Sequence, residues 1–212
     1  MKKEKDNEKE KKLTEAEQKR AERFARISEE MTQQGYTRHD LTIGIGKANL
    51  FALLLLIPLT VIGYGLYFLV HRSLDLASSH FLLMLVAFLV LIVVHELIHG
   101  VCWSIFTPGH FRDVEFGVMR SSLTPYCTCL VPLGKKQYIF GAVMPLLVLG
   151  ILPMIVAIII GNPDLLFLGI LMADSGAGDI MIIRRILAFR SGAKEIVYMD
   201  HPTEAGGVVF ER

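Results

Sequence analysis

The chain has 212 residues, the length of one domain that can bury a sizeable core. Its net charge of +1 offers no basic surface for nucleic acid, and its three cysteines make no disulfide framework. Although 20% of the residues are charged, 52% are hydrophobic and the mean hydropathy is +0.47, because the charges crowd into the first 47 residues, a middle segment and the tail after Ile183. The long uncharged runs between them exclude an ordinary soluble protein and indicate an integral membrane protein.

Residues 1–35 form a leader rich in Lys and Glu, without Gly or Pro before Gly35. A thin apolar stripe recurs in it at helical spacing, at Leu13, Ala16, Phe24, Ile27 and Met31. A run of this charge density predicts a cytosolic helix exposed to solvent or a disordered segment. The alternative is a helix that docks on a partner or on the membrane surface.

Four apolar runs follow, at residues 49–70, 81–106, 138–160 and 165–183. Each is close to the roughly 20 residues that a helix needs to cross a bilayer, and membrane helices tolerate the prolines within them. We therefore predict an all-α membrane protein with four transmembrane helices in residues 36–190, followed by a cytosolic tail at residues 191–212.

The basic residues predict the orientation of these spans. The leader, the long gap at residues 107–137 and the end of the last run carry nearly all the Lys and Arg, whereas the other two gaps hold one Arg between them. Basic residues favour the cytosolic side of a membrane. This distribution predicts a multi-pass protein of the cell membrane with both termini and the long gap in the cytosol.

The long gap has the pattern of two strands. Val114, Phe116 and Val118 alternate with more polar neighbours, and residues 126–133 can return as a second strand. We predict a cytosolic β-hairpin between the second and third spans, with an irregular amphipathic loop as the alternative.

The second run contains the motif H-E-x-x-H at His95, Glu96 and His99. On a helix, residues four apart project from the same face, so both imidazoles can reach one metal ion. The glutamate is rotated by about 100° from His95 and can act as the base for a metal-bound water. Ionisable groups within a membrane span cost about 3 kcal/mol or more and usually mark function. Histidines hydrogen-bonded across the bundle, without a metal, are the alternative.

The fourth run supplies the best candidate for a third metal ligand. Asp179 lies 14 residues after Leu165, as His95 lies 14 residues after Phe81, so two helices that run in the same direction bring both to one depth. The small residues of "DSGAGD" before it let helix backbones approach closely. Asp179 is therefore the predicted ligand.

Five other residues compete with Asp179 less well. Asp174 lies shallower on the same run and on another face, and Asp164 is predicted at the opposite membrane surface. Cys102 lies on the ligand face, where a small buried Cys more often serves packing. His110 and Glu115 can approach only if the long gap folds back.

The sequence resembles a known family at these points. The stretches "HELIHG", "SGAGD" and "DHPTEAGGVVF", together with the four spans, are similar to the DUF3267 zincin peptidases, a bacterial membrane group, over about residues 36–212. The logic is similar to that of site-2 proteases. The resemblance implies His95, His99 and Asp179 as zinc ligands and Glu96 as the catalytic residue. One departure is that site-2 proteases place the ligand in N-P-D-G, whereas Asn162 to Asp164 here are followed by Leu165.

These observations favour a membrane-embedded zinc metalloendopeptidase that hydrolyses peptide bonds of membrane or membrane-proximal substrates, with Zn²⁺ as cofactor and Glu96 as general base. Expected partners are a membrane protein or peptide substrate and the lipid bilayer, without nucleic acid. The predicted hairpin can pair with a substrate as an added strand, and Tyr126 is a candidate oxyanion stabiliser. The alternatives are a non-proteolytic metal-binding membrane protein, such as a transporter or sensor, and an inactive scaffold.

Overall fold

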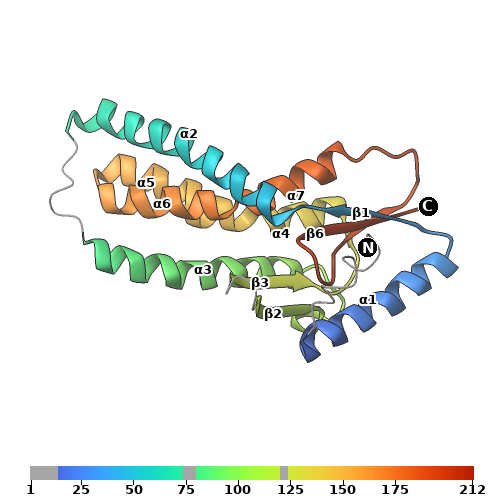
Figure 1. The fold of residues 1–212 in the computed structure, drawn as a ribbon. Helices are drawn as coiled ribbons and strands as arrows, with labels where there is room; N and C mark the ends of the chain where they lie inside the picture. Colours follow the sequence, from blue (N-terminus) through green and yellow to red (C-terminus); the bar gives the residue numbers. More distant parts are fainter. Residues whose placement is uncertain (1–13, 74–79, 120–123) are drawn as a thin grey trace, which may run out of the picture.

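The computed structural model describes residues 14–73, 80–119 and 124–212. Long helices lie side by side over most of the molecule, and the six strands gather with the first helix at one end (Figure 1). This division follows the sequence, because the uncharged runs form the long helices and the charged segments supply most of the other end.

The long helices match the predicted spans closely. Their bounds are α2 (Ile45–His71), α3 (Phe81–Ser104), a continuous rod of α4 (Lys135–Pro145), the π-helical turn η2 (Leu146–Ile151) and α5 (Leu152–Ile160), and the pair α6 (Pro163–Ser175) and α7 (Ala177–Ala188). Within the described residues, three helices are long and apolar enough to cross a membrane, or four if the pair α6 and α7 forms one span bent by 44°. The predicted four spans thus correspond to three straight helices and one broken one.

Small residues let the rods of this bundle approach closely. Gly150, in the π-helical turn, packs against the backbone and side chain of Ala173 on α6. Met154 and Ala157 on α5 pack with Leu166 and Ile170 on α6 in one buried cluster. The outward faces of these helices carry large exposed apolar side chains, as expected for surfaces in contact with lipid.

A four-stranded antiparallel sheet shows that the all-α prediction is wrong. Its strands have the order β1 (Thr37–Thr42), β6 (Gly206–Glu211), β5 (Ile196–Asp200) and β4 (Leu133–Gly134). Residues 191–212, assigned to a tail from sequence, supply β5 and β6. Side chains alternate between the two faces of this sheet. Val209 and Tyr198 face the core with Tyr138 of α4, whereas Val208 and Phe210 face α1.

The predicted hairpin is confirmed. After a short 3₁₀ helix, η1 (His110–Asp113), β2 (Val114–Met119) pairs antiparallel with β3 (Thr124–Cys129). The hairpin lies along α3 (Figure 1). Gly100 of α3 makes this approach possible, because a Cβ there would overlap the ring of Phe116 and meet Cys127.

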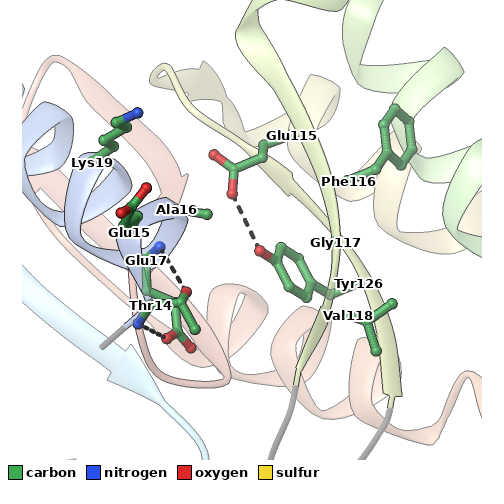
Figure 2. Close-up of a pocket in the computed structure, with 10 residues that line it drawn as sticks. All are labelled: Thr14, Glu15, Ala16, Glu17, Lys19, Glu115, Phe116, Gly117, Val118 and Tyr126. Atoms are coloured by element: carbon green, nitrogen blue, oxygen red, sulfur yellow. Dashed lines mark hydrogen bonds between the residues drawn. The ribbon is translucent and has the colours of Figure 1, made fainter. Parts of the chain in front are cut away.

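The leader contains a helix, α1 (Glu15–Gln33), that packs on the protein itself. Thr14 caps it with a capping box to Glu17, and buried Phe24 packs against the sheet. Arg20 is also buried, so one face of this charged helix packs on the protein while most of its other residues stay exposed or half-buried. Figure 2 shows the start of α1 facing the hairpin across a cavity of about 720 Å³. The preceding part of the predicted leader, residues 1–13, lies outside the described residues.

Candidate metal centre

Helix α3 carries His95, Glu96 and His99 on its inward side. His95 is 5% exposed and His99 is 4% exposed, whereas Glu96 is half-buried. The rings of the two histidines meet edge to face, with centroids 4.8 Å apart, as their spacing of one helical turn predicts. Two imidazoles buried this deeply need polar partners.

Asp179 supplies that partner from the first turn of α7. The break between α6 and α7 falls at Gly176, where the small residues of the "DSGAGD" segment leave room for the bend. Asp179 Oδ2 lies 3.2 Å from His95 Nε2 and 3.4 Å from His99 Nε2, and the two Nε2 atoms are 3.1 Å apart. The structure thus brings together the three residues that the sequence selects as metal ligands.

The three atoms have the spacing that zinc requires. Zinc binds His nitrogen and carboxylate oxygen at about 2.0–2.2 Å in tetrahedral geometry, which places neighbouring ligand atoms about 3.3 Å apart. The observed separations of 3.1, 3.2 and 3.4 Å match this value. Both imidazoles also approach the same carboxylate oxygen, an arrangement that a shared cation explains better than two separate hydrogen bonds do. The donor set therefore fits zinc and leaves a fourth position for water or substrate.

The orientation of the His99 ring is fixed by contacts other than those with the metal cluster. Its Nδ1 donates a hydrogen bond of 2.8 Å to the carbonyl oxygen of Gly141 on α4, which leaves the lone pair of Nε2 directed at the cluster. Trp103 stacks on the same ring at 5.1 Å and donates from Nε1 to the carbonyl oxygen of Tyr138. A Cβ at Gly141 would overlap the indole of Trp103. Sequence reasoning missed this support, and only the single Trp could have drawn attention to it.

The competing residues lie elsewhere. Asp164 approaches His80 at the far end of the bundle, and Asp174 has a buried carboxylate oxygen without a hydrogen bond among the described residues. Cys102 is buried but does not join the cluster. His110 Nδ1 contacts the carbonyl oxygen of Ser104 at 3.0 Å, and Glu115 pairs with Arg20 on α1. Among the described residues only Asp179 completes the site.

The β3 strand passes beside Glu96 with one backbone edge unpaired by β2. Leu130 donates to the carbonyl oxygen of Asp113, so alternate residues of β3 bond to β2 and those between them direct their backbone groups away. Cys127 and Cys129 belong to the second set. The backbone of Cys127 lies against the Glu96 carboxylate. An edge of β3 to which no other described strand pairs thus runs next to the metal cluster and its glutamate.

A cavity of about 470 Å³ leads to the cluster between this strand and the sheet. Its lining residues include Asp179, the apolar Ile43, Ile45 and Ile182, and Thr128 of β3. Arg20 lies at the cavity as well, bonded to the carbonyl oxygen of Pro202 at 2.5 Å and to Glu115 at 2.6 Å. The cavity is large enough for an extended peptide segment.

The other polar groups of β3 are already engaged. The Tyr126 hydroxyl accepts from Arg20 at 2.5 Å and donates to Glu115 at 3.2 Å, so it is committed away from the metal cluster and makes a poor oxyanion stabiliser.

Burial raises the pKa of the Cys127 thiol strongly and that of Cys129 to about 12, so both are neutral thiols at physiological pH.

The fold and the site together define a mostly helical protein with three or four helices apolar enough to cross a membrane and a His-His-Asp group that could hold a metal ion. A family model, DUF3267, described as "putative zincin peptidase", matches residues 88–194, which is half of the chain and includes all three cluster residues. The chain therefore belongs to this family, and the family supports a zinc metallopeptidase. A search of curated proteins and a search of solved structures each find no match.

Proposed function

We propose that the protein is a membrane-embedded zinc endopeptidase that cleaves membrane or membrane-proximal peptides, with the catalytic site open to the cytosol. The observation that carries this proposal is the triangle of His95, His99 and Asp179 beside Glu96. Bound zinc supplies a Lewis acid that polarises a scissile carbonyl and lowers the pKa of water. The residues of the chain supply the binding, orientation and proton transfer around it.

Glu96 is the proposed general base. It follows His95 directly on α3 and is half-buried, so its carboxylate lies next to the cluster without displacing the ligands. It accepts the proton of the attacking water and passes it to the amine of the leaving peptide. The hydrogen bond from His99 to Gly141 keeps the imidazole in the tautomer that a ligand needs.

The free edge of β3 is the proposed binding edge for the substrate backbone. A peptide bond within a transmembrane helix is shielded by its own hydrogen bonds, so the segment must become extended before it can be cut. The outward C=O of Cys127, and its N–H once the segment replaces Glu96 as its acceptor, can pair with such a segment as an added strand. This strand would hold the scissile bond against Glu96.

Glu96→Gln provides the decisive test of this proposal. The amide cannot accept the proton, so cleavage of a peptide or membrane substrate by the purified protein should fall by at least about 100-fold. Zinc content, measured by elemental analysis, should remain at the wild-type level because Glu96 is not a ligand. Glu22→Gln, an exposed glutamate on α1, serves as the matched control.

The main alternative, a non-proteolytic metal-binding membrane protein, predicts the opposite result. In that case Glu96→Gln would keep both the bound zinc and the cellular phenotype of the wild type. Cleavage by Glu96→Gln at the wild-type rate would rule out the endopeptidase proposal.

A further inference from the structure

Asp200, at the end of β5, contacts the outward edge of β3 two residues beyond the place where the backbone of Cys127 lies against Glu96. Its Oδ2 accepts a hydrogen bond of 2.7 Å from the backbone N–H of Cys129. Its Oδ1 accepts a hydrogen bond from the Tyr138 hydroxyl on α4. The residue lies outside the stretch matched by the family model, and it borders the same cavity as Asp179.

These two bonds connect the strand edge to the helix that orients the metal ligand. Tyr138 and Gly141 lie one turn apart on α4, and the carbonyl oxygen of Gly141 accepts the hydrogen bond from His99. The carboxylate of Asp200 thus links β3 to α4, and α4 in turn holds His99. This link runs beside the direct packing of β3 on α3.

Asp200 also limits the edge that a peptide can use. Backbone groups that point away from β2 occur at every second residue of β3, at Pro125, Cys127 and Cys129. Proline has no N–H, and the N–H of Cys129 is occupied by Asp200. The N–H of Cys127 bonds to the Glu96 carboxylate, so an added strand that pairs at Cys127 would take over this N–H from the glutamate.

We propose that Asp200 is a positioning residue, which fixes the free edge of β3 relative to the metal centre and ends the stretch on which a substrate strand can pair. This inference rests on the proposed peptidase function. The proposed role requires two correctly placed hydrogen-bonding atoms rather than a negative charge.

Two substitutions separate positioning from a direct chemical role. In Asp200→Asn, the amide oxygen can accept from Cys129 while the NH₂ group donates to the Tyr138 oxygen, so both links persist. Asp200→Ala removes both links. Asp40→Ala, an exposed acid of the same sheet, is the control for general effects on the sheet.

The experiment uses the full chain in detergent, a peptide that the wild type cleaves, and hydrogen exchange of the β3 amides. Asp200→Ala should speed exchange at Cys129 by about tenfold, since one hydrogen bond is lost. KM for the peptide should rise by about tenfold with a smaller change in kcat, and zinc content should be unchanged. Asp200→Asn and Asp40→Ala should stay within about twofold of the wild type for each quantity.

A second measurement needs no variant and therefore does not depend on folding of Asp200→Ala. A peptide hydroxamate, a chelating inhibitor, should slow exchange of the Cys127 amide on binding and leave that of Cys129 unchanged.

Three results would overturn the inference. They are additional protection of Cys129 by the inhibitor, a wild-type KM in a folded Asp200→Ala, and Asp200→Asn as impaired as Asp200→Ala. The Glu96→Gln test of the peptidase proposal is made in a protein that keeps Asp200. Failure of the peptidase proposal is therefore distinguishable from failure of the proposed role of Asp200.

Discussion

The bundle contains two places where a histidine of α3 or its N-cap meets an aspartate of the pair α6 and α7. At one end His80 Nδ1 lies 3.6 Å from Asp164 Oδ2, and deeper in the bundle His95 Nε2 lies 3.2 Å from Asp179 Oδ2. Each partner in the second pair follows its counterpart in the first by the same 15 residues. The two meeting points therefore reflect one parallel alignment of α3 with the broken helix.

The two pairs differ in burial and in the number of donors. The side chain of His80 is 71% exposed, whereas that of His95 is 7% exposed. Only the inner pair has a second histidine, His99, one turn further along α3. The ring of His99 is oriented by its hydrogen bond to Gly141 and by stacking with Trp103. A His–Asp contact alone is thus an ordinary exposed pair, and three converging, buried donors make a metal site.

Asp179→Ala should show the largest effect of any single aspartate change. Loss of a ligand should lower zinc affinity by more than about 100-fold, since even outer-shell changes cost 10- to 100-fold. Elemental analysis of the purified protein should then find little zinc, while Asp164→Ala and Asp174→Ala should retain the wild-type amount. Full zinc in Asp179→Ala would show that the inner pair is no more a metal site than the outer one.

Gly141→Ala tests whether the contacts that orient the His99 ring affect zinc affinity. The added methyl group overlaps the indole of Trp103, which stacks on His99, so the ring must shift. We expect zinc affinity, measured by competition with a chelator, to fall by about tenfold. Gly178→Ala is the matched control, because a Cβ there meets no atom within 4 Å although it directly precedes Asp179. Equal zinc affinities of Gly141→Ala and Gly178→Ala would mean that the three donor side chains bind zinc without help from the contacts that orient His99.

The contrast between buried and exposed ion pairs recurs at α1, where the expected effect falls on the stability of the fold. Arg20, with a side chain 9% exposed, bonds to Glu115, Tyr126 and Pro202, whereas Arg26 on the same helix is exposed. Arg20→Ala should lower the free energy of unfolding by about 2 kcal/mol and speed hydrogen exchange in α1. Arg26→Ala should change neither. A similar small effect of both variants would mean that Phe24 alone holds the helix.

The cluster could be predicted from sequence because membrane helices rise by a nearly constant distance per residue. Counting from the start of each run places His95 and Asp179 at one depth, and the structure brings them to 3.2 Å. The four-stranded sheet could not be predicted in this way. Thr37–Thr42 pairs with Gly206–Glu211 at the other end of the chain, and no local pattern specifies a partner that distant.

The role of α1 was missed for a related reason. Its charge density indicates a solvated helix, but the partners that bury Arg20 come from β2, β3 and the turn after β5. The stretch "DHPTEAGGVVF", which begins at Asp200, resembles the family but by itself predicts no contact. Its contacts with Cys129 and Tyr138 depend on three segments that meet only in the folded chain.

The π-helical turn η2 sets the rotational phase of the rod that contains it. Gly141 faces α3 and Gly150 faces α6, although nine residues on an unbroken α-helix would place them about 180° apart. A π-helical turn accommodates about one extra residue, which turns the following segment by about 100°. The same rod can therefore present one glycine to His99 and the other to Ala173, on two helices that themselves touch. Shortening η2 by one residue would leave eight α-helical steps between the two glycines, which also places them about 80° apart, so both contacts should persist.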